Sequence, residues 1–573
     1  MYKIFQAELF WSDYQESNSM TTTQPPQPTL SASPITPTQQ PQSPRDYGLP
    51  HDEWRPQQER MIDWEFSIQP GQIGILEAPT GSGKTSGPAA MSTQKRVITL
   101  CRTKGLQSEN YGGGYGFDVL YGRSNYDCVH PDNVDATTDE CLFRDEGMHK
   151  CDHAAECHYL MQKARVKASR KASLNYPYWL VSHWPRESGA GALVLDEAHE
   201  LSDIVLDFAG CQVLERDREK WDLPEFPEIA GSGGMLSQSR PTDKALAWLR
   251  AAYAIAARAA KRWEKSDMKL ARQAERLENK LGATMAAIES CPDDWFIKSG
   301  ERVGFDRGRN VPGIACKPLT ARYHFNNYFP HASSAMILMS ATIGDFDVFA
   351  KELGIKEFSR LALPSVWPPN VRPVQILPAP AMGAKSDERD YDEQARVIAN
   401  AIKACPQEWS GVIHVTRKTE ARLLTQRLAK RGLGARMWVP DERWGTEEQV
   451  AQWTAHKRQA GKNGSKGLGQ IAVVWAWSSG VNLVDEKICI TAKIPYPNIA
   501  DGYECARMLY SGTYYLQRTA QRCEQQMGRT RRGNHGDYDV DGNKNQLVAI
   551  ADANWVRIRK YLSQSFLESL VKE

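Results

Sequence analysis

Short apolar runs recur along this chain, and most are followed by longer and more polar stretches. Such runs are typical of buried strands, and strands that alternate with helical stretches indicate parallel sheets. The runs fall into two sets: 73–76, 97–101, 192–195 and 335–339, then 412–415, 471–475, 488–491 and 547–550. The pattern therefore predicts an α/β protein with two lobes, each built on a parallel sheet flanked by helices.

Residues 243–281 have a different pattern. They contain neither Gly nor Pro, and apolar side chains recur at Leu246, Leu249, Tyr253 and Ala257. This spacing places the apolar side chains on one face of a helix, so the stretch between the two sets of runs is predicted to be helical.

Composition narrows the class of protein. At 573 residues the chain exceeds one typical core, which predicts two or more domains. Its 41% apolar and 24% charged residues are those of a soluble globular protein. The net charge of +2 means that any affinity for nucleic acid comes from local patches. No run approaches the about 18 apolar residues of a membrane span, and no secretory signal is visible, so we expect no membrane association and a cytoplasmic location.

The N-terminal segment differs from the rest. Residues 15–50 are dominated by Gln, Pro, Ser and Thr, with few charges and few large apolar side chains. Such a segment cannot bury enough surface to offset its ordering entropy, so we expect residues 1–48 to be disordered.

A glycine-rich segment directly follows the first apolar run: residues 77–85 read Glu-Ala-Pro-Thr-Gly-Ser-Gly-Lys-Thr. Between a strand and a helix, such a loop lets backbone N–H groups surround a polyphosphate. Lys84 can reach the β- and γ-phosphates of ATP, and the Thr85 hydroxyl can hold Mg²⁺. The predicted cofactor-binding residues of this loop are Ala78 (where the strict motif has Gly), Pro79, Thr80, Gly81, Ser82, Gly83, Lys84 and Thr85.

Two carboxylates follow the apolar run 192–195, where the chain reads Asp-Glu-Ala-His from Asp196 to His199. The carboxyl ends of parallel strands are where α/β sheets bind ligands. Asp196 is therefore predicted to complete the Mg²⁺ shell, and Glu197 to orient and deprotonate the attacking water. A solvated strand end is the simpler interpretation of each carboxylate alone, but their order after the phosphate loop favours a site that hydrolyses ATP or a close relative.

Two more segments complete the predicted site. Ser340 to Thr342 end the run 335–339, where hydroxyls either link the phosphate site to its neighbours or cap a turn. Gln525, Arg529 and Arg532 share one helix face, because they are spaced by four and three residues. Two guanidiniums there either stabilise charge on a transferred phosphoryl group or form a solvated basic face. The predicted catalytic residues are Lys84, Asp196, Glu197, Gln525, Arg529 and Arg532.

Four cysteines fall within thirty residues, at Cys128, Cys141, Cys151 and Cys157. In a reducing compartment this density indicates metal ligation rather than disulfides. Four thiolates suit zinc or an iron–sulfur cluster, and the lack of paired C-x-x-C knuckles favours iron–sulfur. Uncoordinated thiols remain a third interpretation, and neighbouring histidines keep a mixed zinc site open: His130, His149, His153 and His158.

Taken in order, these motifs resemble those of the iron–sulfur branch of superfamily 2 DNA helicases that includes XPD, Rad3 and DinG, and the resemblance is nearest to DinG-like bacterial and phage members. It covers roughly residues 50–560. Arg55 and Gln58 resemble the adenine-side element, and residues 99–107 resemble the segment that touches the nucleic-acid backbone. Residues 414–416, 477–482 and 525–532 fit further family motifs in order.

The resemblance implies two RecA-like motor domains, a [4Fe–4S] cluster held by the four cysteines, and an ATPase that unwinds DNA with 5′→3′ polarity. It adds Arg55, Gln58 and His199 to the ATP site and implies DNA contacts at Thr103, Lys104 and Thr416. The implied partners are single-stranded DNA and forked or R-loop DNA, with replication, repair or CRISPR effector proteins as candidates, and the chain is expected to act as a monomer.

The resemblance also implies a domain plan with two insertions into the first motor domain. Residues 243–281 contain ten Lys and Arg against five Asp and Glu. This basic excess fits either a surface that lines the path of a nucleic-acid strand or a solvated helix face. The plan is motor domain 1 over 49–122, 163–205 and 301–368, an iron–sulfur domain over 123–162, a helical arch over 206–300 and motor domain 2 over 369–573.

One departure from the family pattern leaves an alternative open. Asn482 stands where members of the resembled family usually carry Asp. The position of a bound nucleic-acid strand and the hydrolysis of ATP could therefore be coupled differently. The alternative is an ATP-dependent nucleic-acid-binding switch with weak or no unwinding, such as a CRISPR-associated DinG-like accessory factor. A metal-stabilised binding module with a degenerate motor is a further alternative, which the complete set of catalytic residues opposes.

Overall fold

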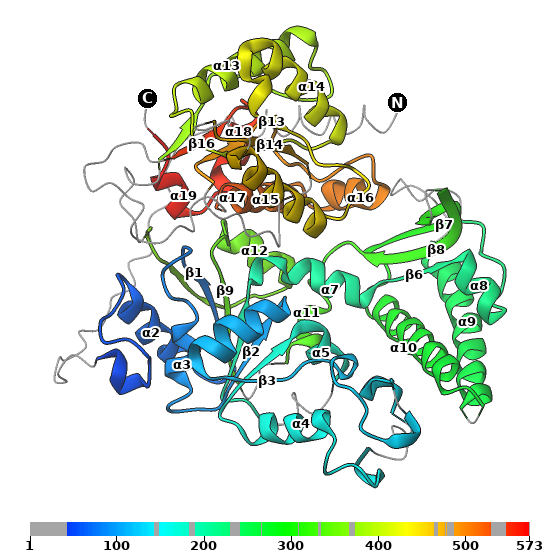
Figure 1. Ribbon diagram of the computed structural model, residues 1–573. Helices are drawn as coiled ribbons and strands as arrows, with labels where there is room; N and C mark the ends of the chain where they lie inside the picture. Colours follow the sequence, from blue (N-terminus) through cyan, green and yellow to red (C-terminus); the bar gives the residue numbers. More distant parts are fainter. Residues whose placement is uncertain are drawn as a thin grey trace.

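The computed structural model describes residues 43–133, 135–141, 148–182, 189–229, 241–264, 266–306, 309–330, 334–365, 373–462, 468–475, 477, 486–528 and 546–571. They form two parallel sheets and a small antiparallel sheet, with helices packed on their faces (Figure 1). The predicted disordered N-terminus lies outside the described residues as far as residue 42, and Pro44–Tyr47 form a short 3₁₀ turn, η1.

The first lobe is built on a seven-stranded sheet in the order β10-β1-β9-β5-β2-β4-β3, and its described strands pair in parallel. Strands β1, β2, β5 and β9 are buried along their whole length, as expected where helices cover both faces of a sheet. The strands are β1 (Ile73–Glu77), β2 (Val97–Cys101), β3 (Asp118–Val119), β4 (Lys171–Asn175), β5 (Ala192–Asp196), β9 (Ala335–Ser340) and β10 (Ser359–Ala362).

Alternate side chains of these strands fill two cores on opposite faces of the sheet. Ile75 of β1 belongs to one core, whereas the next residue, Leu76, belongs to the other. Helices α2 (Gln58–Ser67) and α3 (Ser86–Met91) cover the Leu76 side. The Ile75 side is covered by α4 (His158–Ala168), α5 (Tyr176–Val181), α7 (Leu201–Ala209), α11 (Phe325–Tyr328) and α12 (Phe346–Leu353).

The second lobe is built on a six-stranded sheet in the order β11-β16-β15-β12-β14-β13, whose described pairings are also parallel. Its strands are β11 (Val374–Ile376), β12 (Gly411–His414), β13 (Met437–Trp438), β14 (Ile471–Val474), β15 (Ile488–Thr491) and β16 (Leu547–Ile550). Its helices are α13 (Glu388–Lys403), α14 (Lys418–Leu428), α15 (Thr446–Lys462), α16 (Gly502–Tyr510), α17 (Gly512–Met527), α18 (Trp555–Ile558) and α19 (Gln564–Glu568).

A third unit leaves the first lobe after α7 and returns before α11. Two long helices, α9 (Pro241–Trp263) and α10 (Met268–Ser290), pack against each other, and the Asp267 side chain caps α10 by accepting from Leu270 N–H. They share a core with α8 (Glu215–Trp221) and with an antiparallel sheet of β6 (Cys211–Leu214), β7 (Trp295–Asp306) and β8 (Arg309–Pro318). This sheet extends across residue 300, where the domain plan placed a boundary.

The segment between β3 and α4 contains the cysteine quartet, and its described part consists of short turns. The remaining short elements of the described chain are the 3₁₀ turns η3 (Arg123–Asn125), η4 (Pro131–Asn133), η5 (Thr138–Glu140), η6 (Met148–Lys150), η7 (Ala198–Glu200), η9 (Gly434–Arg436) and η10 (Arg559–Tyr561), and the π-helical turns η2 (Leu106–Gly113) and η8 (Ala429–Leu433). Asp139 of η5 pairs with Arg276 of α10, so this segment contacts the third unit.

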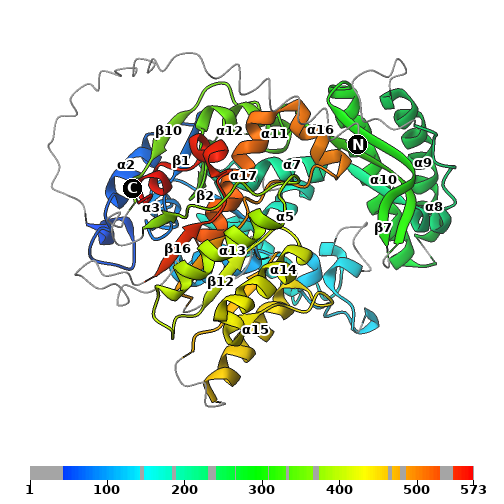
Figure 2. The ribbon, with the colours of Figure 1, turned by 90° about the horizontal axis from the view of Figure 1, so that it is seen from above.

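The predicted fold class is confirmed, because each apolar run coincides with a buried strand of one of two parallel sheets. The second lobe lies over the carboxyl-end side of the first, and α17 packs on α12 across the boundary (Figures 1 and 2). Within the described ranges, no helix is long and apolar enough to cross a bilayer.

Candidate nucleotide site between two lobes

The phosphate loop runs from the end of β1 to the start of α3. Gly81 and Gly83 adopt φ of 93° and 83°, values that favour glycine over any other residue. At Gly83 a Cβ atom would also lie 2.6 Å from Gln58 Nε2. These two glycines are therefore required by the backbone, and their N–H groups precede the helix as in a polyphosphate-binding loop.

Lys84 folds back over this loop. Its Nζ donates to the Ala78 carbonyl oxygen at 2.8 Å, so the ammonium lies within the turn that the backbone makes. Ala78 itself is fully buried, and its N–H donates to the Ser340 carbonyl of the neighbouring strand at 2.9 Å. The Cβ at this position packs in the core, which accounts for an alanine where the strict motif has glycine.

Arg55 and Gln58 lie against the outside of the loop. The Gln58 side chain accepts from Arg55 N–H at 3.0 Å and donates to Ser86 Oγ at 2.7 Å, and Arg55 Nη1 donates to the Gly81 carbonyl at 3.1 Å. Both residues are thus brought to the predicted phosphate loop, although the bonds they make here are to the protein.

Asp196 ends β5 beside this loop and is only 5% exposed. Burial and the adjacent Glu197 carboxylate raise the pKa of Asp196 to about 6, while the Lys84 ammonium opposes that rise. Two buried tyrosines hold it: Tyr111 Oη donates to Asp196 Oδ2 at 3.0 Å, and Tyr176 Oη donates to the Asp196 carbonyl at 2.7 Å. A buried carboxylate next to a lysine suits a divalent cation bound with a phosphate.

Glu197 follows in the left-handed region, with φ of 54°. This conformation is uncommon for a residue other than glycine, and it occurs where surrounding structure enforces it, often at functional sites. Its carboxylate lies 3.4 Å from His199 Nδ1. The turn thus aims two successive carboxylates in different directions at the end of one strand.

A hydrogen-bonded chain crosses from the first lobe to the second. His199 Nδ1 lies 2.8 Å from Ser340 Oγ, which accepts from Thr342 N–H at 3.1 Å. Gln525 of α17 donates from Nε2 to Thr342 Oγ1 at 3.1 Å, and the same nitrogen lies 3.5 Å from His199 Nε2. Three motifs that are far apart in sequence therefore meet at one point of the interlobe boundary.

Arg529 and Arg532, the other two residues of the predicted catalytic helix face, lie outside the described residues, as does Asn482. Their roles stay predictions.

The predicted nucleic-acid contacts lie at the ends of strands. Thr416 follows β12, and its hydroxyl donates to Glu420 Oε2 at 2.8 Å. Thr103 Oγ1 accepts from Leu106 N–H at 3.3 Å, and Lys104 Nζ donates to Asn125. A cleft of about 450 Å³ opens between the lobes here, and its lining includes Arg102, Thr416, Trp475, Arg518 and Arg522.

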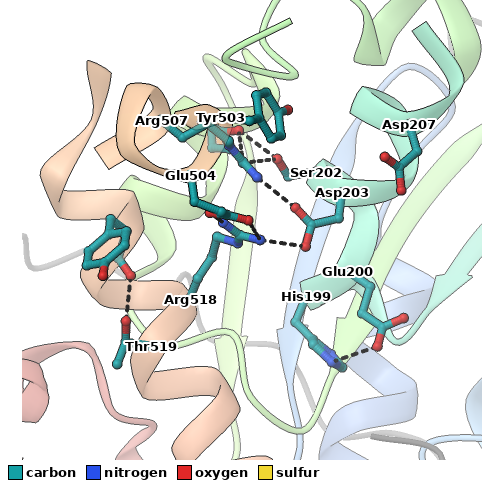
Figure 3. A network of polar contacts seen from close by, with 12 residues as sticks. His199, Glu200, Ser202, Asp203, Asp207, Tyr503, Glu504, Arg507, Arg518 and Thr519 are labelled. Atoms are coloured by element: carbon teal, nitrogen blue, oxygen red, sulfur yellow. Dashed lines mark hydrogen bonds and ion pairs between the residues drawn. The ribbon is translucent and has the colours of Figure 1, made fainter. Parts of the chain in front are cut away.

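Ion pairs join the two lobes beside this cleft (Figure 3). Arg507 Nη1 lies 2.8 Å from Asp203 Oδ1, and Arg518 Nη2 lies 3.0 Å from Asp203 Oδ2. Arg507 also lies 3.3 Å from Glu352. Burial raises the pKa of the Glu352 carboxyl, and the Arg507 guanidinium opposes that rise. Asp203 and Glu352 come from α7 and α12 of the first lobe, and both arginines come from the second, so the network bridges the boundary.

The part of the chain that the structure describes does not bring the cysteine quartet together as a metal site. None of the four cysteines forms a disulfide, and in the described ranges no three His, Cys, Asp or Glu side chains group so that they could hold a metal ion. Cys141 and Cys157 are buried in the first-lobe core with Met148, whereas Cys128 and Cys151 are partly exposed. The described residues therefore do not show the expected [4Fe–4S] cluster, which stays a prediction.

Several residues of this site carried no recognisable sequence signal. Tyr111 comes from a π-helical turn, and Glu77, Arg507 and Arg518 act through contacts made only in the folded chain. Glu77 offered one hint, since a charged residue directly follows an apolar strand run.

No protein-family model and no curated protein matches this chain. Among solved structures, one described as an XPD helicase covers 91% of this chain and 100% of its own at 15% identity, with a TM-score of 0.52. A structure described as apo XPD covers 88% of this chain and 98% of its own at 13% identity, with a TM-score of 0.47. A DEAD box protein from Methanococcus jannaschii covers 91% and 93% at 11% identity, with a TM-score of 0.33. The first likeness shows the fold, which is that of two RecA-like domains.

Proposed function

We propose that this chain is a nucleic-acid motor that hydrolyses ATP between its two lobes. The observation that carries the proposal is the Gln525 side chain of the second lobe, which contacts both Thr342 and His199 of the first. A site built from both lobes senses their separation, so binding and hydrolysis of a nucleotide can close and open the cleft.

Each residue has a defined role in this proposal. Backbone N–H groups of the phosphate loop and the Lys84 ammonium bind the β- and γ-phosphates, and Glu197 orients the attacking water and accepts its proton. Thr85 and Asp196 would hold Mg²⁺, which neutralises charge on the phosphate oxygens. Arg529 and Arg532 are proposed to stabilise charge on the transferred phosphoryl group.

Nucleic acid is proposed to cross both lobes at the strand ends. The support is the arrangement of Arg102 and Thr416 on opposite walls of one cleft. Hydroxyls, backbone amides and guanidiniums at such positions bind phosphates without reading sequence. Thr103 and Lys104, which directly follow Arg102, would extend this contact along the first lobe.

The finer proposal is a DNA helicase with 5′→3′ polarity that acts on single-stranded, forked or R-loop DNA. Its support is the order of motifs along the sequence together with a fold similar to that of an XPD helicase. Replication, repair and CRISPR effector proteins remain the candidate protein partners.

A [4Fe–4S] cluster on Cys128, Cys141, Cys151 and Cys157 belongs to the same finer proposal. Its support is the presence of four cysteines within one short segment of the sequence. No step of the motor depends on it. Iron, sulfide and zinc analysis of the purified protein tests it: about four irons and four sulfides per chain are expected, and one zinc without iron would replace the cluster by a zinc site.

The test of the motor is ATP hydrolysis with and without single-stranded DNA, followed by strand displacement on duplexes with 5′ or 3′ single-stranded tails. Hydrolysis should rise on adding the strand, and the 5′-tailed duplex should be unwound. Absence of ATP hydrolysis under both conditions would refute the proposal.

A nucleic-acid-binding switch driven by ATP remains the second candidate function. It is favoured by Asn482, which stands where members of the resembled helicase family usually carry Asp. It shares the ATPase site but predicts binding without unwinding. Strand-stimulated hydrolysis without displacement of either tailed duplex would favour the switch over the helicase.

A further inference from the structure

Three glutamines of α17 face the loop that follows β9. Gln517, Gln521 and Gln525 are spaced by four residues and so share one face of the helix. Gln517 Nε2 and Gln521 Nε2 both donate to the Ile343 carbonyl oxygen, at 2.9 and 3.1 Å, while Gln525 reaches Thr342. Gln525 alone belongs to the predicted motif, so two of the three contacts are additional.

Both amides are buried. Gln517 is 0% exposed, and Gln521, which lines the interlobe cleft, is 4% exposed, so water has little access to either side chain. A buried amide that loses its acceptor is left without a hydrogen-bond partner, which is unfavourable. Movement of α17 therefore either carries the loop with it or breaks both bonds together.

The opposite side of the same loop is held by the strand that carries the phosphate loop. Ile343 N–H and Gly344 N–H donate to Glu77 Oε2 at 2.9 and 2.7 Å. Glu77 is the last residue of β1 and directly precedes Ala78, whose carbonyl accepts from Lys84. One residue, Ile343, is thus bonded to the second lobe through its carbonyl and to the phosphate-loop strand through its N–H.

The loop itself has little freedom to absorb a displacement. Gly344 adopts φ of +78°, and a Cβ at this position would lie 2.4 Å from the Tyr561 carbonyl oxygen of the second lobe. The loop is therefore packed against the second lobe as well as bonded to it, and its backbone permits only glycine there.

We propose that Gln517 and Gln521 are positioning residues that couple movement of the second lobe to the phosphate loop. A nucleic-acid strand bound across both lobes sets the position of α17, and the two amides pass this position through Ile343 and Glu77 to the residues that bind phosphate. The inference rests on the proposed motor function and adds to it the route by which nucleic acid accelerates ATP hydrolysis.

The test replaces both amides by side chains of similar length that cannot donate. For the double variant Gln517→Met/Gln521→Met, we measure ATP turnover with and without an oligo-dT strand, and KM for ATP. The ratio of stimulated to unstimulated turnover should fall at least about fivefold, the lower range of coupling between sites. KM for ATP should stay within about twofold of the wild-type value, since neither amide touches the nucleotide loop.

Gln394 supplies a matched control. It is a buried glutamine of α13 whose Nε2 donates to two backbone carbonyls, those of Ala492 and Ala551, but all three residues lie in the second lobe. Gln394→Met removes the same kind of bond without crossing the boundary. It should lower the melting temperature yet keep the stimulation ratio.

The outcomes separate this inference from the function on which it rests. If the wild type hydrolyses ATP with strand stimulation and the double variant keeps its ratio, the coupling role is wrong and the motor stands. If stimulated and unstimulated turnover fall equally, as loss of packing would cause, the coupling role is also wrong. Should the double variant fail to fold, each single variant retains one donor to Ile343, and a partial loss of the ratio is expected from either. A wild type without ATPase activity overturns the motor itself.

Discussion

At the scale of single residues, Glu77 is an unusual group to find inside a core. It is 2% exposed at the end of β1, and burial raises its pKa to about 7 despite three backbone N–H donors. A carboxyl whose pKa is raised in the folded state holds a proton there that the unfolded chain releases. The free energy of unfolding must therefore fall as pH rises from about 4.5 through about 7.

We expect Glu77→Gln to remove this decline, because the amide keeps an acceptor oxygen for Ile343 and Gly344 and carries no charge. In urea denaturation at pH 5 and pH 8, the variant should gain stability relative to the wild type at pH 8 only, by up to about 3 kcal/mol. An equal difference at both pH values would show that the carboxyl is not protonated in the fold.

Tyr111 presents a second residue-scale prediction. Its hydroxyl is fully buried and donates to Asp196, the proposed Mg²⁺ ligand. Groups that orient a ligand in this way typically change metal affinity by about 10-fold or more. Tyr111→Phe should therefore raise the Mg²⁺ concentration for half-maximal ATP hydrolysis about tenfold. An unchanged Mg²⁺ dependence would mean that the hydroxyl serves packing alone.

The sequence predicted the residues of this site much better than their supports. Lys84, Asp196 and His199 follow apolar strands in recognisable order, because parallel strands place their carboxyl ends at one edge. Tyr111 lies in no such motif, and Glu77 opens the segment 77–85 without any sign of its partner. The partners Asp196 and Ile343 are 85 and 266 residues away from Tyr111 and Glu77 along the chain. Only the folded chain brings such pairs together.

At the scale of elements, the ion pairs between α7 and helices α16 and α17 hold the lobes together. The Arg507 and Arg518 side chains are 4% and 7% exposed, so each loses much of its hydration. Arg507 pairs with carboxylates of the first lobe, whereas Arg518 pairs with Asp203 of the first lobe and with Glu504 of the second. Asp203 serves both, although its own side chain is 47% exposed, which limits the strength of the pairs.

Asp203→Ala should therefore lower stability by about 1–2 kcal/mol, measured by urea denaturation, and widen the lobes in solution X-ray scattering. Asp207→Ala is the matched control. Asp207 lies one turn further along α7, away from both arginines (Figure 3), and pairs with Lys317 instead. If the two variants behave alike, the network does not hold the boundary.

Strands and helices were predictable to different degrees. The runs 488–491 and 547–550 coincide with β15 and β16, because strands covered on both faces read as unbroken apolar runs. Strand β7 was not predicted, since Lys298, Ser299 and Glu301 interrupt it and its antiparallel sheet has an open face. The stretch 243–281, predicted to be helical, proved to contain two helices, α9 and α10, and Asp267 caps the start of α10.

At the scale of the whole molecule, two lobes share one site while a third unit and the cysteine segment extend from the first. The lobes were predictable because each carries its own set of apolar runs. Their mutual orientation was not, because it depends on polar contacts between the lobes, such as that of Gln525 with Thr342, which no periodic pattern encodes. The cysteine segment shows the same limit, since spacing alone does not determine which way each thiol points.

The most direct measurement is steady-state ATP hydrolysis by the wild type and by Lys84→Ala, each with a saturating single strand and a melting curve to verify folding. Removing one preorganised charge from a phosphoryl-transfer site costs about a hundredfold or more in turnover. We expect that loss without a fall in melting temperature, because Lys84 donates to the Ala78 carbonyl within its own loop rather than to a distant element. A folded Lys84→Ala protein that hydrolyses ATP at the wild-type rate would contradict the assignment of this interlobe site.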